Sequence, residues 1–186
     1  SPNTSLAQAS GIPCSRGILT DHCLRTRCPD VWAAGDCAEL TDETTSLVQS
    51  VWYTGRAQGE AAARSICGSE EVYEPGIWFN SAKFFNLEYQ VYGEVPSATQ
   101  SESTPPSLYW EHPSGRQAIR IVHRQGAVVG FNLMGIRFRH RVCEDWIRRQ
   151  YELEKVLSEL DKANFSPEFS RRDYRKIRNQ FREVSS

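Results

Sequence analysis

The chain has 186 residues, which is room for one or two small domains. Its formal net charge is −1, so bulk charge gives no reason to expect nucleic acid or a membrane surface as a partner. Hydrophobic residues make up 39% of the chain, and no apolar stretch approaches the length of a membrane span. The composition therefore predicts a globular protein that binds neither nucleic acid nor membrane.

The six cysteines are spread along the chain, and no two of them form a Cys-x-x-Cys pair. This spacing argues against a zinc or iron–sulfur site. The start of the chain, residues 1–4 (Ser-Pro-Asn-Thr), is polar and lacks the charged and apolar regions of a secretory leader. We therefore expect reduced thiols and a cytoplasmic location.

In the first third of the chain we expect a short helix around residues 5–9 and a strand over 17–20. The apolar run from Val31 to Ala34 stands between Pro29 and Gly35. This pattern predicts a second strand, over residues 30–35, buried on both faces of a sheet. The polar residues 38–45 then predict a surface loop.

A helix is predicted from about residue 47 or 50 to residue 66. Four alanines favour it, and Gly68 suits its end. Gly55, Gly59 and Ala62 fall at helical spacing, so we expect a face on which a neighbouring backbone can approach closely.

Residues 69–76 are polar and end in Pro-Gly, which indicates a domain boundary. We expect one domain over residues 1–72 and a second over residues 73–186. A polar, flexible loop is expected over residues 96–107 of the second domain. Its predicted strands cover residues 84–95, 108–111, 117–124 and 127–134, the last two joined by a turn at Gln125-Gly126. Helices are predicted over 138–157 and about 168–182, with a break near 163–167, so the second domain and the whole chain are α+β.

Asp36 is the strongest candidate for a binding residue. It follows the predicted strand, at the end where a parallel sheet opens toward a ligand. An ionised carboxylate only accepts hydrogen bonds, so it suits the hydroxyl groups of a sugar or a ribityl chain. The alternative is a carboxylate that caps the turn. The chain has no Gly-x-Gly-x-x-Gly turn to hold a pyrophosphate.

Residues 17–38 resemble the second FAD fingerprint of FAD-dependent pyridine-nucleotide oxidoreductases. The matching segments are Gly-Ile-Leu-Thr-Asp at 17–21, Leu-Arg-Thr at 24–26 and Pro-Asp-Val-Trp-Ala-Ala-Gly-Asp-Cys-Ala at 29–38. The branch of ferredoxin and rubredoxin reductases, NADH oxidases and apoptosis-inducing-factor-like proteins matches best. The resemblance implies FAD as cofactor, NAD(P)H as electron donor and Asp36 as acceptor for the ribityl hydroxyls. Gly35 leaves space for the cofactor.

The resemblance extends to the helix that begins near Ser50, Val51 and Trp52. Trp52 with Gln58-Gly59 is similar to the family's Trp…Gln-Gly pattern. In the family this helix points its positive N-terminus at the flavin pyrimidine ring, where reduced flavin carries negative charge. Packing of Trp52 in the core is an equal alternative.

Residues 75–81 and 86–93 resemble the segment that places an aromatic side chain beside the flavin ring in ferredoxin-reductase relatives. Either Trp78 or Phe79 is that aromatic, and a hydrophobic seam between domains is the alternative. Cys23 and Cys28 have the spacing of a redox disulfide, but in this family that motif lies in an upstream helix. We therefore expect Cys23 and Cys28 to be free thiols.

The resemblance implies the C-terminal segment of a longer enzyme that passes electrons from NAD(P)H through flavin to a ferredoxin- or rubredoxin-like carrier or another acceptor. The segment would form one wall of the flavin site, and no catalytic residue is expected in it because the cofactors carry the hydride. The isolated chain would be inactive. The alternative is a homodimerisation or partner-docking module over residues 77–186. The basic residues 171–178 are a docking candidate, with a solvated helix face as the alternative.

Overall fold

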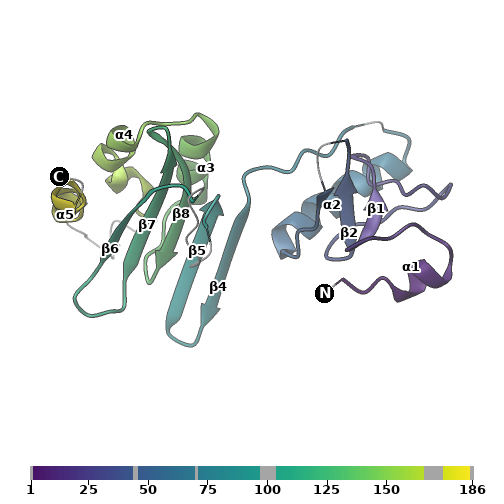
Figure 1. Ribbon diagram of the computed structural model, residues 1–186, viewed down its shortest axis with the longest axis horizontal. Helices are drawn as coiled ribbons and strands as arrows, with labels where there is room; N and C mark the ends of the chain where they lie inside the picture. Colours follow the sequence, from purple (N-terminus) through teal and green to yellow (C-terminus); the bar gives the residue numbers. More distant parts are fainter. Residues whose placement is uncertain (1, 44–45, 70, 97–103, 166–173, 185–186) are drawn as a thin grey trace. The chain divides into compact units, whose positions relative to one another are not determined.

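The computed structural model describes residues 2–43, 46–69, 71–96, 104–165 and 174–184. It divides the chain into two compact units, Ser1–Gly76 and Ile77–Ser186 (Figure 1). Each unit has its own sheet and its own hydrophobic cluster. Among the helices of the described ranges, none has the length and apolar character needed to cross a bilayer.

The first unit contains a small three-stranded sheet. Strand β1 (Ile18–Thr20) runs parallel to β2 (Ala38–Thr41), and β3 (Ser46–Leu47) is antiparallel to β2. The short helix α1 (Ser5–Ala9) precedes the sheet, and the long helix α2 (Trp52–Ile66) follows it. The expected helix at 5–9 and the strand ending at Thr20 are confirmed.

The strand predicted over residues 30–35 is wrong. In this stretch only Trp32 joins a β-bridge, with Arg25, and of the run from Val31 to Ala34 only Ala33 is buried. The segment passes beside the turn at Leu24, whose carbonyl accepts a hydrogen bond from the Ala33 N–H. An apolar run makes a strand only when a second strand lies beside it along its length, and here the neighbour is a turn.

The strand lies instead at 38–41, where a surface loop was predicted. Ala38, Glu39 and Leu40 are each 1% exposed. Glu39 made the segment look like a loop, because an ionised side chain is rarely buried without partners. Its carboxylate accepts hydrogen bonds from the Gly17 N–H and the Ser46 hydroxyl, and these partners allow its burial.

Helix α2 ends as its sequence predicts. Gly68 has a φ of +88°, a conformation that favours glycine. The N–H of Gly68 donates to the Ser65 carbonyl and the N–H of Ser69 donates to the Arg64 carbonyl. These two bonds form a Schellman motif, which satisfies carbonyls that the helix end would otherwise leave without partners. The buried face of α2 contributes Ala61 and Ala62 to the cluster of the first unit.

The second unit is built on a five-stranded antiparallel sheet with strand order β4-β5-β8-β7-β6. The strands are β4 (Phe79–Phe84), β5 (Leu87–Gly93), β6 (Ser107–Glu111), β7 (Ala118–Arg124) and β8 (Ala127–Met134). The predicted turn at Gln125-Gly126 is confirmed. Both residues have positive φ, 51° and 85°, as a two-residue hairpin turn requires.

The strand expected over 84–95 is β5, which covers only Leu87–Gly93. Phe85 takes a φ of +51° in the turn before β5, and β4, the other strand of this hairpin, was not predicted. The helix expected over 138–157 is α3 (His140–Arg148) followed by α4 (Leu153–Ser158). Gln150, with a φ of +51°, takes the place that a glycine normally holds after a helix, so no breaker residue marks the end of α3.

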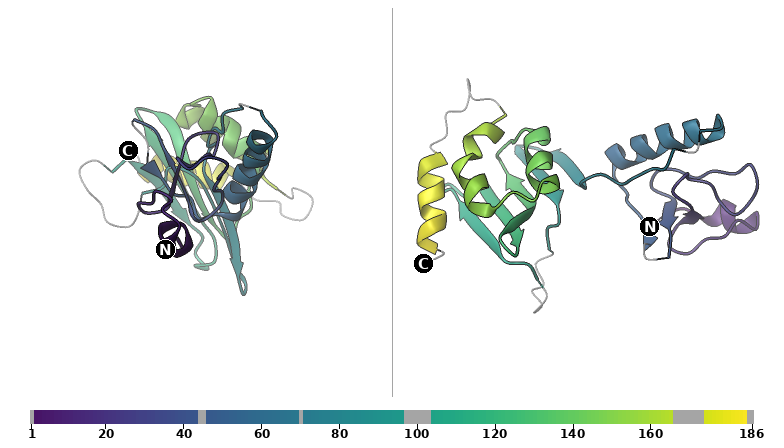
Figure 2. Two further views of the ribbon diagram at one scale, coloured as in Figure 1. Left: turned by 90° about the vertical axis from the view of Figure 1, so that its right-hand side faces the viewer. Right: turned by 90° about the horizontal axis from the view of Figure 1, so that it is seen from above.

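The remaining helices are a 3-10 turn η1 (Leu160–Ala163) and α5 (Tyr174–Val184). Part of the expected last helix, residues 168–173, and part of the loop over 96–107 fall outside the described residues. Helices α3 and α4 pack on β8, and α5 packs on β6, with α3 and α4 on one face of the sheet (Figure 2). Ile177 and Phe181 of α5 join the same core as the sheet. The predicted α+β class is confirmed.

Candidate functional site

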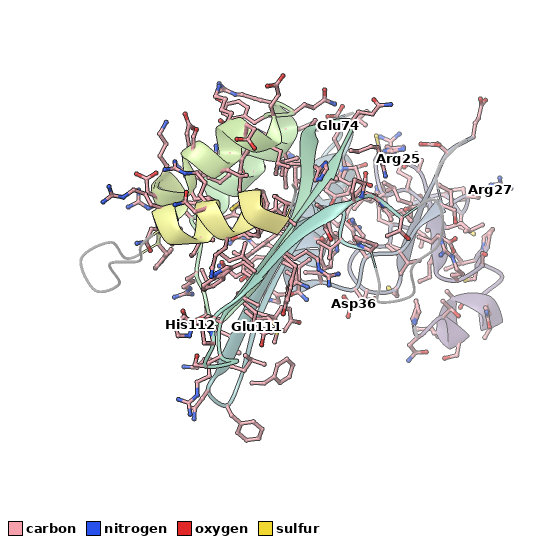
Figure 3. The ribbon with its side chains drawn as sticks, turned by 60° about the vertical axis from the view of Figure 1, so that its left-hand side comes forward. Arg25, Arg27, Asp36, Glu74, Glu111 and His112 are labelled. Carbon is pink, nitrogen blue, oxygen red and sulfur yellow. The ribbon has the colours of Figure 1, made fainter. Side chains whose placement is uncertain are left out.

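The Gly35-Asp36 turn lies directly before β2. Gly35 has a φ of +82°, which a residue with a side chain adopts only with strain. The N–H of Ala38 donates to the Gly35 carbonyl at 3.0 Å and closes the turn. Asp36 projects from this turn as an exposed side chain (Figure 3).

The carboxylate of Asp36 differs from that of Asp21, at the end of β1. Asp21 Oδ1 accepts hydrogen bonds from the N–H groups of Cys23 and Arg25, at 2.8 and 2.9 Å, and so organises its own turn. Within the described ranges, Asp36 has no hydrogen-bond or ion-pair partner. The capping role therefore belongs to Asp21, whereas the carboxylate oxygens of Asp36 have no donor within the described ranges.

Helix α2 holds this turn at two points. The N–H of Gly35 donates to Oε1 of Gln58 at 2.7 Å, and Gln58 is only 3% exposed. A side-chain carbon added at Gly55 would lie 3.4 Å from the Cα of Gly35. The expected close approach of a neighbouring backbone is thus confirmed at Gly55, whereas Gly59 has nothing within 4 Å and faces open space.

The N-terminus of α2 has no side-chain cap. Val51, the residue before the helix, has an extended conformation and makes no capping hydrogen bond, and the first turn carries no acidic residue. The first N–H groups of a helix have no partner inside the helix, and they give this end a positive potential. An electron-rich or anionic group is therefore favoured near this end.

Trp52 stands at this helix start with 69% of its surface exposed, so the alternative of core packing is wrong for this residue. Its ring meets the ring of Tyr53 edge to face, with centroids 5.3 Å apart. Ser50 is exposed and Val51 is buried. Flavin contact by Ser50, Val51 and Trp52 stays a prediction.

Trp78 and Phe79 belong to the second unit and are both partly buried. The ring of Phe79 stacks on Tyr92 with centroids 4.8 Å apart and lies 4.5 Å from the ring of His140. Phe79 is therefore packed against the core of its own unit, which leaves Trp78 as the better candidate for the flavin-side aromatic. That role stays a prediction for both residues.

Glu39 is a buried carboxylate that the sequence did not single out. It is the second residue of β2 and accepts hydrogen bonds from Gly17 N–H at 2.8 Å and from the Ser46 hydroxyl at 2.7 Å. Burial by itself raises the pKa of Glu39, but the bonds from Ser46 and Gly17 and the charge of Arg16 outweigh it and hold the pKa below its usual value.

His22 joins two segments of the first unit. Its Nε2 lies 2.8 Å from Oδ2 of Asp42, and its Nδ1 lies 3.2 Å from the carbonyl oxygen of Tyr73. Both neighbours are acceptors, so the doubly protonated ring satisfies both. The hydrogen bond with Asp42, then that with Tyr73, raises the pKa of His22.

All six cysteines of the chain are free thiols. Cys23 and Cys28 are among them, as expected from their position in a turn-rich connection. Cys143 is buried in the core of the second unit, and burial raises its pKa. In the described ranges no three His, Cys, Asp or Glu side chains come together as a metal site.

Residues 1–59 match the family described as pyridine nucleotide-disulphide oxidoreductase. The chain is 30% identical over 135 residues to nitrite reductase [NAD(P)H] of Bacillus subtilis, covering 72% of this chain and 16% of the relative. It is 29% identical over 136 residues to rubredoxin-NAD(+) reductase of Alcanivorax borkumensis, covering 72% of this chain and 32% of the relative. The chain thus spans less than a third of the length of these relatives.

Solved structures share the fold. An FAD-dependent pyridine nucleotide-disulphide oxidoreductase from Desulfovibrio vulgaris is similar over 100% of this chain and 47% of its own, with a TM-score of 0.66 and 15% identity. The putidaredoxin reductase–putidaredoxin complex is similar over 90% of this chain and 38% of that chain, with a TM-score of 0.63 and 16% identity. The matched sequence and the shared fold define the class, that of FAD-dependent oxidoreductases.

Within that class, the chain belongs to the pyridine nucleotide-disulphide oxidoreductase family. Members of this family depend on FAD and on NAD(P)H. The matched segment, residues 1–59, includes the Gly35-Asp36 turn and the start of α2. The exposed carboxylate of Asp36 and the uncapped start of α2 therefore both lie in the part of the chain that matches the family.

Proposed function

We propose that this chain forms one wall of the flavin site in an enzyme that passes electrons from NAD(P)H through FAD to a small redox protein of the rubredoxin or ferredoxin kind. One observation carries the proposal. Asp36 is an exposed carboxylate without a partner in the described ranges, on a turn that Gln58 and Gly55 hold against the first half of α2. An acceptor in this position is available to an external ligand.

The residues present fit a flavin. Asp36 accepts hydrogen bonds only, and a ribityl chain offers hydroxyl donors. Gly35 places no side chain in the path of a ligand that approaches the turn. The uncapped start of α2 favours negative charge, by about 0.3–1 kcal/mol at an exposed helix end. When bound, FAD supplies the hydride and electron chemistry, and the chain's own residues bind and orient it.

The partner proposal is supported by relatives. Two of them are named for reactions with small redox proteins, rubredoxin-NAD(+) reductase of Alcanivorax borkumensis and the putidaredoxin reductase complex. The free state of all six thiols fits a cytoplasmic location. A glycine-rich turn for the pyrophosphate is absent from this sequence, so another segment must supply it.

The test is FAD binding by the protein expressed from the complete gene. Asp36→Ala removes a charge-assisted hydrogen bond, which predicts a Kd for FAD raised by about tenfold to a hundredfold. Titration of the apoprotein with FAD, followed by quenching of flavin fluorescence, measures it. Glu74→Ala is the control, because Glu74 is also an exposed carboxylate of the first unit. Equal Kd values for the wild type and Asp36→Ala would remove Asp36 from the flavin site.

The isolated 186-residue chain provides a second measurement. We expect it to bind FAD weakly, because its sequence lacks the pyrophosphate turn. Its flavin absorbance after dialysis against FAD gives the stoichiometry. One tightly bound flavin per chain would contradict the proposal that this chain is only one wall of the site.

A second candidate function is self-association through the second unit. Strand β4 is an edge strand of the sheet, whereas the opposite edge strand, β6, is packed against α5. At the tip of the β4–β5 hairpin, Phe84 is 60% exposed and Phe85 is 97% exposed. An open edge next to exposed aromatic rings favours pairing with the same edge of a second copy.

Light scattering of the 186-residue chain tests this candidate. We expect a concentration-dependent dimer mass for the wild type and a monomer mass for Phe85→Ser. Leu6→Ser is the matched control, because Leu6 is 80% exposed but lies in α1 of the first unit. A monomer mass for the wild type at all concentrations would exclude self-association by this edge.

A further inference from the structure

Gln58 makes the one side-chain hydrogen bond that α2 has with the Gly35-Asp36 turn in the described ranges. Its Oε1 accepts the Gly35 N–H at 2.7 Å, and only an oxygen of the amide can accept this bond. Gln58 is 3% exposed. A buried amide is costly unless it is hydrogen-bonded, so the side chain and the turn hold each other in place.

The contact lies close to the start of the helix. Gly55 and Gln58 are three residues apart and therefore lie on the same face of α2. Gly55, whose missing side chain gives the Cα of Gly35 its space, is one helical turn from the first helical residue, Trp52. The turn that carries Asp36 is thus held beside the first turn of the helix, which is the range over which the positive potential of a helix end acts.

Ser65 is a second buried polar residue of α2 and can be compared with Gln58. Ser65 is also 3% exposed, and its Oγ accepts hydrogen bonds from Nε1 of Trp32 at 3.0 Å and Nε of Arg25 at 3.3 Å. Ser65 lies two turns further along α2 than Gln58, on the same face. Both residues tie α2 to the preceding loops, but only Gln58 is bonded to the residue next to Asp36.

We propose that Gln58 is a positioning residue for the flavin site: its amide oxygen, through the Gly35 N–H, sets the place of the Asp36 carboxylate beside the start of α2. This inference rests on the proposed function. Without the bond, Gly35 loses its anchor to the helix and Asp36 samples positions in which its oxygens no longer meet the ligand's hydroxyls. Affinity then falls because the site must be ordered when the ligand binds.

The test uses the protein expressed from the complete gene and compares Gln58→Met with Ser65→Ala. Methionine keeps the length of the side chain but has no strong acceptor. We expect both variants to lower the melting temperature, because each removes a buried hydrogen bond. Only Gln58→Met is expected to raise the Kd for FAD, by about threefold to tenfold, and to change the visible circular dichroism of the bound flavin.

Two further variants separate the possible outcomes. Gln58→Glu keeps an acceptor at the same place and is expected to restore part of the FAD affinity that Gln58→Met loses. In the background of Asp36→Ala, the additional effect of Gln58→Met on the Kd is expected to shrink, because the two residues act on one contact. Full additivity of the two effects would overturn the proposed route through Asp36.

The proposed function and the positioning role fail in different ways. If Asp36→Ala leaves the Kd for FAD unchanged, the flavin site itself is misplaced. If Asp36→Ala weakens binding but Gln58→Met behaves like Ser65→Ala, with a lower melting temperature and an unchanged Kd and flavin spectrum, then Asp36 binds flavin and Gln58 has a structural role only.

Discussion

Different interactions stabilise each of the two units internally. The cluster of the first unit has four buried hydrophobic residues among those described, Leu24, Leu40, Ala61 and Ala62. The core of the second unit has eighteen, drawn from the sheet and its helices. In the first unit, buried polar side chains connect β2 and α2 to loops that are distant in sequence. Glu39, Gln58 and Ser65 each form such a hydrogen bond.

Apolar burial and hydrogen bonds differ in how precisely they position individual atoms. Apolar burial is roughly proportional to area and has no direction, so it makes the second unit stable without setting the place of any single atom to high precision. Hydrogen bonds are directional, and those of the first unit define the places of individual backbone groups such as the Gly35 N–H. A directional hydrogen bond therefore sets the position of the Gly35-Asp36 turn, for which ligand binding stays a proposal.

The largest expected effect is a cavity in the second unit. Phe131 is fully buried, and its ring packs against the rings of Tyr92 and Trp146. Phe131→Ala is expected to lower the free energy of unfolding by about 3–5 kcal/mol. Urea denaturation followed by near-ultraviolet circular dichroism measures this loss. Arg116→Ala, at an exposed side chain of the same unit away from the β4 edge, is the control and should change it by less than about 0.5 kcal/mol.

A loss below about 1 kcal/mol for Phe131→Ala would show that the stability of the second unit does not depend on its apolar core.

The next effect concerns the buried carboxylate of the first unit. Glu39→Ala leaves the Gly17 N–H without its partner and is expected to cost about 1–3 kcal/mol. Hydrogen–deuterium exchange of peptides within residues 17–41 should become faster in the variant. Glu74→Ala, at an exposed carboxylate of the same unit, should leave this exchange unchanged.

Glu39 also predicts a response to acid. Its pKa is lowered in the folded protein, so its contribution to stability is present above the unfolded value of about 4.3 and is lost as the pH falls through the folded pKa. The exchange difference between the wild type and Glu39→Ala should therefore narrow below about pH 4. A difference that stays constant down to pH 2 would show that the charge of Glu39 is not what stabilises the turn.

The smallest expected effect is the contribution of His22 to stability, which is lost as the pH rises instead of as it falls. The pKa of His22 is raised, so its contribution is present below the unfolded value of about 6.5 and is lost as the pH rises through the folded pKa. The pair with Asp42 is partly exposed, so we expect less than about 1 kcal/mol. Melting temperatures of the wild type and His22→Gln should therefore differ at pH 6 and converge toward pH 9, and a gap that widens with pH would contradict this assignment.

Turn and helix-end residues in the sequence predicted those element boundaries at which the backbone needs a positive φ and a residue suited to it is present. Gln125-Gly126 marked the hairpin turn, and Gly68 marked the end of α2, because positive φ values suit these residues. The end of α3 was missed because Gln150 adopts positive φ without being a glycine. The hairpin at Phe85 was missed for the same reason, since an aromatic residue rarely takes that conformation.

The position of β2 was missed for a different reason. The run from Val31 to Ala34 is more apolar than residues 38–41, so local pattern favoured the wrong segment. Pairing decides the matter, because Ile18 of β1 lies opposite Ala38 and leaves the earlier run beside a turn. Glu39 is then buried with partners at Gly17 and Ser46, which are neighbours only after folding.

Residue types at short spacing were enough to predict the family resemblance, the α+β class and a cofactor-binding role for Gly35 and Asp36, and that role stays a prediction. Which carboxylate has no partner within the described part of the chain follows only from the folded structure. Asp21 and Glu39 are used within the fold, whereas Asp36 stays open on a turn that Gln58 holds from 23 residues away. Hydrogen-bond partners distant in sequence meet only when the chain folds, so no local pattern distinguishes a carboxylate that builds the protein from one that is left to bind.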